Sequence, residues 1–171
     1  MESNHIRRIA FVDLDGTVCN SEKRFEQAYR NGRIDWKIAF HPALLEMDEL
    51  LTHAPAILDR LENDGWQIIY LSSRPQMLHR PTRNWLKLNG LLLGVEGERE
   101  IILKPEKYRM SSSAKWKAEV ISKRASSAAE ILFIDDEPEN IMAVRGLWSG
   151  KGYGRELLKT FKSLELIFGE K

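Results

Sequence analysis

Two acidic side chains one residue apart, Asp13 and Asp15, follow an apolar run near the start of the chain. Side chains alternate along an extended strand, so both carboxylates start on the same face. Like charges this close cost free energy unless a cation, a proton or hydrogen bonds offset their repulsion. A second acidic pair, Asp135 and Asp136, closes another apolar run far along the chain. We expect one hard cation with oxygen ligands, such as Mg²⁺, to hold the two pairs together.

Four apolar runs are typical of strands, and polar or amphipathic stretches separate them. The predicted strands cover residues 6–12, 66–71, 100–103 and 131–134. Helices are predicted over residues 55–63, after the N-cap candidates 111–113 and from Pro138 onward. Strands that alternate with helices predict an α/β, Rossmann-like fold of three layers with a central, mostly parallel sheet.

Polar side chains lie where three of these predicted strands end. Asp13 follows the first, Ser72 follows the second, and the pair Asp135–Asp136 follows the last. In open parallel sheets, ligands bind at the carboxyl ends of the strands, where the strand order reverses. The sequence therefore predicts one site that combines these side chains.

The connecting stretches have weaker patterns. Residues 21–31 are polar with spaced aromatics, which predicts a helix that Gly32 ends. Pro75 suits the first turn of a helix, and Pro81 either kinks that helix or starts a new one. Two further predictions concern the C-terminal part, namely a glycine-rich loop over residues 146–154 and a terminal helix around residues 157–168.

The composition is that of a soluble globular protein, which we interpret as a single domain over residues 1–171. Hydrophobic residues make up 43% and charged residues 30%, and the net charge of +1 gives no global attraction to nucleic acid or anionic membranes. No run approaches the ~20 apolar residues of a membrane span, and the polar start is no signal peptide. Cys19 is the single cysteine, which excludes an intramolecular disulfide and favours a reducing, cytoplasmic setting.

The stretch 13–17, with the sequence DLDGT, resembles the first motif of the haloacid dehalogenase (HAD) superfamily, most of whose members are magnesium-dependent phosphohydrolases. Ser72, Lys117 and the pair Asp135–Asp136 match the later motifs of that superfamily in type and order. The resemblance spans residues 6–148. It implies the HAD form of the Rossmann-like fold and a phosphatase activity.

The resemblance implies two catalytic carboxylates and a metal site. Asp13 would be the nucleophile that forms an aspartyl-phosphate, and an aspartate is ionised at neutral pH without help from a base. Asp15 would be the general acid and base, and its backbone carbonyl would bind the metal with Asp13. Asp136 is the preferred direct ligand of Mg²⁺, with Asp135 beside it either binding the ion or supporting it.

The resemblance also implies a set of groups that bind the substrate phosphate. These are Thr17, Ser72, Ser73, Arg74 and Lys117, with backbone N–H groups of the turn at residues 73–74 assisting. Lys117 is the preferred phosphate-binding lysine, and Lys115 and Lys104 stay open as alternatives. The four histidines show no ligand spacing, and we interpret them as non-catalytic.

Residues 18–53 are too few for a large cap and too many for a hairpin, so they predict a small cap or flap insertion. Within them, residues 34–40 resemble a segment of the phosphatase half of bacteriophage-type polynucleotide kinase/phosphatases, as do residues 71–75 and 103–105. That branch removes phosphates, often 3′-phosphates, from nucleic acids or nucleotides. The implied partner is a nucleic-acid end or a phosphorylated small molecule such as a sugar phosphate. No Gly-x-x-x-x-Gly-Lys-Ser/Thr loop is present, so the chain carries no kinase half.

Other classes fit the sequence less well. A receiver-type signalling module also groups aspartates around Mg²⁺, but its acidic pair comes early, and a mutase would need an enclosing cap to exclude water. A cysteine-dependent phosphatase needs five residues between its cysteine and arginine, whereas four separate Cys19 from Arg24. Single-strand binding favours aromatic platforms beside cations, of which Trp36 with Lys37 gives only a weak indication.

Overall fold

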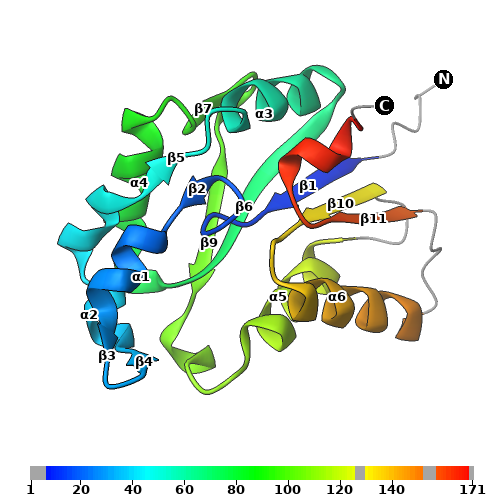
Figure 1. Cartoon of the computed structure of the whole chain (residues 1–171). Coiled ribbons are helices and arrows are strands. Elements are labelled where there is room, and N and C mark those ends of the chain that lie inside the picture. The colour runs from blue at the N-terminus through cyan, green and yellow to red at the C-terminus, as the bar shows by residue number, and fades with distance from the viewer. Residues whose placement is uncertain (1–6, 126–129, 152–156, 170–171) are drawn as a thin grey trace, which may run out of the picture.

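The computed structural model describes residues 7–125, 130–151 and 157–169 (Figure 1). Its centre is a five-stranded sheet in the order β11-β10-β1-β6-β9, and every pairing in it is parallel. The strands are β1 (Arg8–Val12), β6 (Trp66–Pro75), β9 (Glu100–Lys104), β10 (Glu130–Ile134) and β11 (Leu158–Phe161). The α/β fold with a parallel central sheet is confirmed.

Helices cover both faces of the sheet, and alternate residues of each strand point to opposite faces. In β1, Ala10 and Val12 pack with helices α3 (Ala54–Asn63) and α4 (His79–Leu88) on one face. Ile9 and Phe11 pack on the other face, under α5 (Ser113–Arg124) and α6 (Pro138–Gly150). Figure 1 shows these two helical layers on either side of the strands. Both layers bury the sheet, which explains the near-continuous apolar character of its strands.

The register of the sheet brings the predicted strand ends together. Val12 of β1 is paired with Ile134 of β10 and with Tyr70 of β6. The residues after these positions therefore meet at one edge, as the strand-end pattern predicted. At that edge the backbone N–H of Asp13 donates to the carbonyl of Ile134 at 2.9 Å. The pairing of β6 with β9 is irregular between Ser72 and Pro75.

Residues 18–53 form a set of short elements at the carboxyl edge of the sheet. These are β2 (Cys19–Asn20), α1 (Glu22–Ala28), β3 (Tyr29–Arg30), β4 (Arg33–Ile34), α2 (Trp36–Ala39), η1 (Pro42–Met47) and β5 (Glu49–Leu50). The antiparallel pairing of β2 with β5 joins the two ends of this insertion. Figure 1 shows α1 and α2 gathered at one end of the molecule, beyond the strands.

Two predictions in the first half of the chain need correction. Helix α1 ends at Ala28 and not near Gly32, because β3 and β4 form a hairpin whose turn residues, Asn31 and Gly32, have positive φ angles of 50° and 81°. Pro75 is the last residue of β6 and does not open a helix; η2 (Gln76–Leu78) follows it. A new helix, α4, then begins at His79 with Pro81 in its first turn, where a missing N–H costs nothing.

The C-terminal predictions were also wrong in part. Residues 146–150, predicted as a loop, complete α6, and residues 152–154 of that prediction lie outside the described ranges. The predicted terminal helix over 157–168 is instead the edge strand β11 followed by η5 (Leu164–Ile167). The free edge of β10 supplies the pairing that decides this, and a four-residue run is too short to show its own period.

The remaining short elements are β7 (Leu93–Gly94), β8 (Gly97–Glu98) and η3 (Glu106–Tyr108). Within the described ranges, every helix is too short or too polar to span a membrane.

Candidate active site

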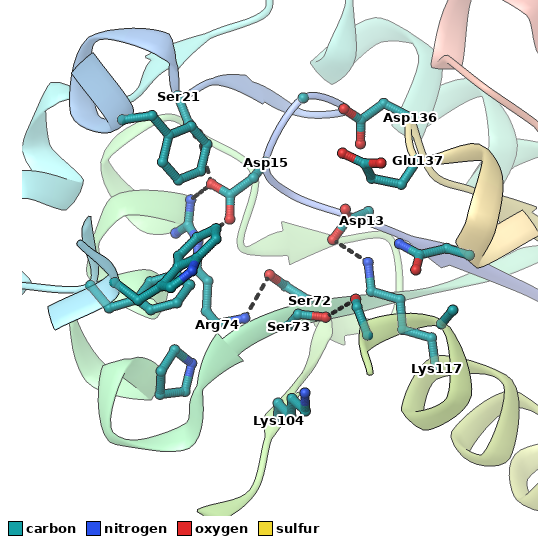
Figure 2. Close-up of a pocket in the computed structure, with 18 of the residues that line it drawn as sticks. Asp13, Asp15, Ser21, Ser72, Ser73, Arg74, Lys104, Lys117, Asp136 and Glu137 are labelled. Carbon is teal, nitrogen blue, oxygen red and sulfur yellow. Dashed lines mark hydrogen bonds and ion pairs between the residues drawn. The ribbon is translucent and has the colours of Figure 1, made fainter. Parts of the chain in front are cut away.

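A cavity of about 1350 Å³ opens at the carboxyl edge of the sheet, between the strand ends and the 18–53 insertion. Most of the predicted site residues line it, and Figure 2 shows them converging from several elements. The predicted residues in its lining are Asp13, Asp15, Ser72, Ser73, Arg74, Lys117 and Asp136. Thr17 and Asp135 do not line it, because both are buried behind the cavity wall.

A buried lysine links the first acidic motif to the second. The Nζ of Lys117, in α5, lies 2.9 Å from Oδ1 of Asp13 and 2.7 Å from Oδ2 of Asp135. Although burial favours the neutral amine, the two carboxylates raise the pKa of Lys117 above its usual value, so the side chain stays charged. Of the three candidate lysines, Lys117 is the one that contacts the nucleophile candidate.

The buried carboxylate of Asp135 connects Lys117 to the start of α6. Its Oδ2 accepts a hydrogen bond from Lys117, and its Oδ1 accepts from Nδ2 of Asn140 at 2.8 Å and from the backbone N–H of Glu137 at 3.0 Å. Both oxygens of this buried side chain are thus used inside the protein. Asp136, by contrast, is exposed and lines the cavity. Asp135 therefore positions Lys117 and the start of α6, whereas the Asp136 carboxylate is exposed at the cavity and can bind a ligand.

Gly16 allows Asp136 to lie over the loop that follows β1. Its φ of +76° is in the region that favours glycine, and a Cβ built on it would stand 2.1 Å from Oδ2 of Asp136. The DLDGT turn and the second acidic pair therefore touch at this point. A residue with a side chain at position 16 would push the Asp136 carboxylate out of place.

The acidic residues fit a hard divalent cation. One oxygen from each of Asp13, Asp135 and Asp136 lies within 4.8 Å of the others. Burial raises the pKa of Asp13 to about 7, with Asp135 and Asp15 adding to the effect and Lys117 opposing it. Burial also raises the pKa of Asp136 to about 6, again with help from Asp135. Carboxylates that repel one another in this way suit the oxygen-rich coordination of Mg²⁺.

Asp15 points away from this acidic group and into a cluster of arginines (Figure 2). Arg74 donates from Nε to Oδ2 at 3.0 Å and from Nη2 to Oδ1 at 2.6 Å, and Arg24 pairs with the same Oδ1. The hydroxyl of Ser21 also donates to Oδ1, at 2.6 Å. Burial alone would raise the pKa of Asp15, but the two guanidinium groups and the Ser21 hydroxyl together hold it well below its ordinary value. The side chain is therefore a carboxylate in this state.

Asp48, from the end of the insertion, completes a buried cluster of four charges. Its Oδ1 accepts from Nε of Arg24 at 2.8 Å, and its Oδ2 accepts from Nη2 of Arg74 at 2.6 Å. Asp15, Arg24, Asp48 and Arg74, which we call the ionic cluster, carry two charges of each sign. Because the cluster is balanced and hydrogen-bonded, its burial is tolerable. It ties α1 and the junction between η1 and β5 to the ends of β1 and β6.

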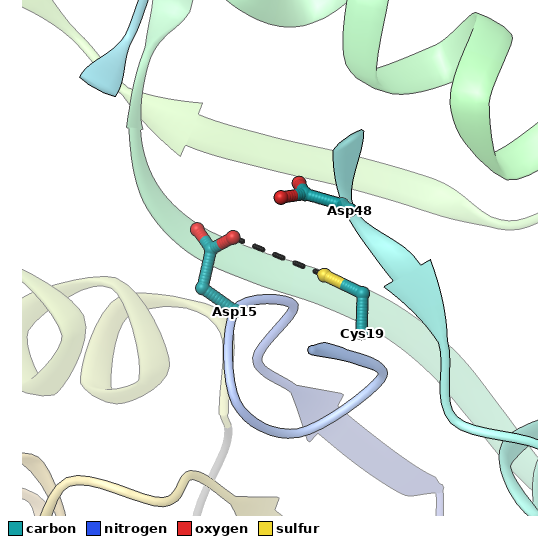
Figure 3. A group of neighbouring side chains, drawn as sticks. All are labelled: Asp15, Cys19 and Asp48. Carbon is teal, nitrogen blue, oxygen red and sulfur yellow. Dashed lines mark hydrogen bonds between the residues drawn. The ribbon is translucent and has the colours of Figure 1, made fainter. Parts of the chain in front are cut away.

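A second group of possible metal ligands, Asp15, Cys19 and Asp48, is not a metal site on chemical grounds (Figure 3). Both carboxylates already bind guanidinium groups, whose positive charge repels a cation. Burial raises the pKa of the Cys19 thiol to about 12, so it is no thiolate ligand or nucleophile. Cys19 is thus a neighbour of the site without a chemical role in it.

The hydroxyl residues have different surroundings. Ser72 is buried at the cavity wall, and its Oγ accepts from the backbone N–H of Arg74 at 3.3 Å. Ser73 is hydrogen-bonded through its hydroxyl to the hydroxyl of Ser113, at the start of α5. The hydroxyl of Thr17 is buried and has no hydrogen-bond partner among the described residues. Ser72 and Ser73 thus face the cavity, and Thr17 does not.

No protein-family profile and no curated protein sequence matches the chain. Among solved structures, a chain of the Pnkp1/Rnl/Hen1 RNA repair complex is similar with a TM-score of 0.63 and 18% identity, over 95% of this chain and 44% of that one. The class C acid phosphatase from Bacillus anthracis with tungstate bound is similar with a TM-score of 0.58 and 18% identity, over 93% of this chain and 68% of that one. The HAD domain of effector protein Lem4 from Legionella pneumophila has a TM-score of 0.56 and 14% identity, over 92% of this chain and 86% of that one. The chain has the HAD fold.

This outcome confirms the fold that the DLDGT motif predicted. The chain spans less than half the length of the RNA repair chain that it matches. In this HAD fold, the motif residues occupy the carboxyl edge of the parallel sheet, where Lys117 joins Asp13 to Asp135.

Several residues of the HAD-fold site were not found from the sequence. Arg24 and Asp48 lie in short, irregular elements of the insertion, and an arginine or aspartate in such a stretch resembles any surface charge. Asn140 was detectable in principle, because a side chain in the first turn of a helix that follows a strand end faces back toward that end. Phe25 and Phe40, which also line the cavity, were not identified either.

Proposed function

We propose that the protein is a Mg²⁺-dependent phosphomonoester hydrolase that works through an aspartyl-phosphate on Asp13. The observation that carries this proposal is the placement of the Asp13 carboxylate at the cavity, 2.9 Å from the Lys117 ammonium and beside the exposed Asp136. A phosphate dianion repels a carboxylate nucleophile, so a site for this chemistry must gather positive charge around the phosphorus. Lys117 supplies one such charge.

Asp13, Asp136 and the backbone carbonyl of Asp15 are the groups that would hold Mg²⁺. Bound there, the ion would offset the charge of the phosphoryl group and hold it in line with Asp13. Asp135 would act indirectly, through its hydrogen bonds with Lys117 and Asn140. Ser72 and the backbone N–H groups that follow it would bind the phosphoryl oxygens.

The reaction would proceed in two displacements. In the first, a carboxylate oxygen of Asp13 forms a bond to phosphorus, the ester P–O bond breaks, and the leaving oxygen takes a proton from Asp15. In the second, water attacks phosphorus and gives its proton to Asp15, and the bond to Asp13 breaks. The ionic cluster favours the carboxylate form of Asp15, which suits the second step. The first step requires Asp15 to take up a proton from solvent beforehand, so its contacts with the arginines must weaken when substrate binds. Arg74 is the arginine of the cluster that lines the cavity and that a phosphate would meet.

We further propose that the substrate is a nucleotide or polynucleotide 3′-phosphate, and that residues 18–53 act as the cap that selects it. The similarity to a chain of an RNA repair complex supports this substrate class, as does the size of the cavity. Drug-sized ligands fill pockets of roughly 300–1,000 Å³. The cavity of about 1350 Å³ has room for more than one small phosphorylated metabolite. The single buried thiol of Cys19 is in keeping with a cytoplasmic setting.

A phosphate-release assay tests this function. The panel contains 3′-phosphorylated oligonucleotides, mononucleotides, sugar phosphates and an aryl phosphate, each with Mg²⁺ and with chelator. We expect Mg²⁺-dependent release that Asp13→Asn abolishes, while Asp64→Asn, an exposed aspartate outside the cavity, keeps wild-type turnover. Full activity in chelator or in Asp13→Asn would contradict the mechanism. A strong preference for sugar phosphates would retain the mechanism and remove the nucleic-acid substrate.

A further inference from the structure

Three aromatic rings contact one another on the wall of the cavity. Trp36 of α2 is stacked on Phe40, with ring centroids 5.4 Å apart and an interplanar angle of 23°. Phe25 of α1 meets Trp36 edge to face at 6.1 Å and 78°. All three residues line the same cavity as Asp13. We call this set the aromatic platform.

Packing in a hydrophobic core does not explain why a tryptophan occupies position 36. It is 56% exposed, whereas Trp85, Trp116 and Trp148 are buried in the two main cores. The backbone that carries it is anchored, because Asp35 caps α2 by accepting hydrogen bonds from the backbone N–H groups at positions 37 and 38. A large indole that is stacked on Phe40 and exposed at the cavity can stack against a flat ligand.

One side chain, that of Arg24, connects the platform to the Asp15 carboxylate. The guanidinium of Arg24 pairs with Asp15, and its carbon lies 4.7 Å from the centre of the Phe25 ring and 6.0 Å from that of Phe40. The cation–π contacts thus connect the platform to the ionic cluster directly. A flat group stacked on the platform and a phosphate at Asp13 would occupy the same cavity, as the base and the phosphate of one strand end would.

Cations beyond the phosphoryl site line the same cavity. Lys37 is next to Trp36. Lys104 is the last residue of β9 and donates to the backbone carbonyl of Ser111, and Arg109 follows η3 and pairs with Glu106. Within the described part of the chain, the ammonium of Lys37 has no ion-pair or hydrogen-bond partner. A single phosphomonoester group needs only the charges around Asp13, whereas a nucleic-acid strand brings further backbone phosphates. Stacking rings beside an unpaired cation such as Lys37 are typical of single-strand binding surfaces.

We infer that Trp36, backed by Phe40, stacks on an unpaired base at the phosphorylated end of a single-stranded nucleic acid, and that Lys37 binds a backbone phosphate of that strand. This inference rests on the proposed function and assigns to it a base-binding subsite on the insertion. The subsite is sequence-tolerant, because every base presents a flat face.

The test compares two single-stranded oligonucleotides with a 3′-phosphate, identical except that one has abasic sugars at its last two positions. We expect the wild-type protein to prefer the base-bearing strand, with a KM roughly 5- to 150-fold lower. In Trp36→Ala this preference falls toward one, and Trp36→Phe, which keeps a flat ring, retains most of it. The matched control is Tyr29→Ala, because Tyr29 is another cap aromatic with 56% exposure that does not line the cavity, and it keeps the preference.

A binding experiment separates this inference from the proposed function. Fluorescence anisotropy measures the Kd of each oligonucleotide for Asp13→Asn, which needs no turnover. Trp36→Ala in that background is expected to weaken binding of the base-bearing strand only. Lys37→Gln is expected to reduce the salt dependence of Kd, with the exposed Lys87→Gln as its control.

Three results would overturn the inference. In the first, wild-type protein binds both strands equally, and in the second, the preference survives in Trp36→Ala while thermal melting shows that the variant is folded. In the third, the protein prefers a phosphotyrosine peptide and Trp36→Ala removes that preference, which would assign the platform to a protein substrate. Absence of turnover on every phosphomonoester, with the base preference in binding intact, would instead reject only the proposed reaction.

Discussion

Removal of the Lys117 ammonium is the most informative single perturbation of this site. Lys117→Met keeps the length of the side chain and leaves Asp13 and Asp135 as buried carboxylates without their common partner. Breaking a buried ion pair by removing one partner costs about 3–5 kcal/mol, because an uncompensated charge stays inside the protein. For a chain of 150–250 residues, each 1 kcal/mol lowers Tm by roughly 2–4 °C. We therefore expect a loss of about 6–20 °C in Tm at pH 7.

The neighbouring Lys115 supplies a matched control. It is on the same helix two residues earlier and is exposed, so Lys115→Met is expected to change the free energy of unfolding by no more than about 0.5 kcal/mol. The double variant Lys117→Met, Asp135→Asn removes one of the stranded charges and keeps an oxygen for Asn140. It is expected to be more stable than Lys117→Met alone.

Calorimetry and urea unfolding give the stabilities, and phosphate release gives the catalytic effect. Loss of one hydrogen-bond donor to the charge that develops in the transition state typically lowers kcat by a factor of about 10²–10³. We therefore expect a decrease of about that size for Lys117→Met, and none for Lys115→Met or Lys104→Met. Equal melting temperatures for Lys117→Met and Lys115→Met would refute the reasoning about the buried ion pairs. A larger kcat loss in Lys104→Met or Lys115→Met would move the phosphate-binding role to that lysine.

Three other predictions follow from the geometry of the loop and the ionic cluster. Gly16→Ala and Gly90→Ala both place a side chain at positive φ, and each should lower the free energy of unfolding by about 1–2 kcal/mol. Only Gly16→Ala clashes with Asp136, so only this variant should bind Mg²⁺ more weakly in titration calorimetry. Equal Mg²⁺ affinities of the two variants would count against Asp136 as a ligand. The folded-state pKa of Asp15 lies below its ordinary value, so the unfolded chain binds more protons and stability falls as the pH drops below about 4. The urea midpoint of Asp15→Asn should fall less steeply with pH over that range than the midpoint of the wild type. An equal pH dependence of the two midpoints would be evidence against the arginine pairing. Asp48→Asn leaves two buried guanidinium groups sharing one carboxylate and should lose about 3–5 kcal/mol in urea unfolding, whereas a loss under 1 kcal/mol would show that the cluster is not stabilising.

The central sheet and the cavity at its carboxyl edge were predictable because the signals are local. Buried parallel strands are apolar along their whole length, and the polar residue at the end of each marks the edge where they meet. Asp13, Ser72 and Asp136 could thus be assigned to one site before any contact was known. Lys117 was the preferred choice among three lysines, and the structure brings that lysine to Asp13.

The errors occurred where pairing across the chain decides the structure. Strand β11 has only four residues, and its identity depends on the edge of β10, not on its own pattern. The ionic cluster joins positions 15, 24, 48 and 74, and no spacing in the sequence predicts that these four side chains meet. The direction of Asp15 was missed for the same reason, because alternation along a strand ceases to apply once the chain turns at Gly16.

The ionic cluster has a consequence for the exchange of parts between proteins of this fold. Grafting a foreign segment in place of residues 18–53 would remove Arg24 and Asp48 together and leave Asp15 with Arg74 alone, which preserves neutrality. A graft that keeps either one without the other would bury an unbalanced charge where the insertion meets the ends of β1 and β6. Chimeras that retain or discard this pair as a unit should therefore be more stable than those that split it.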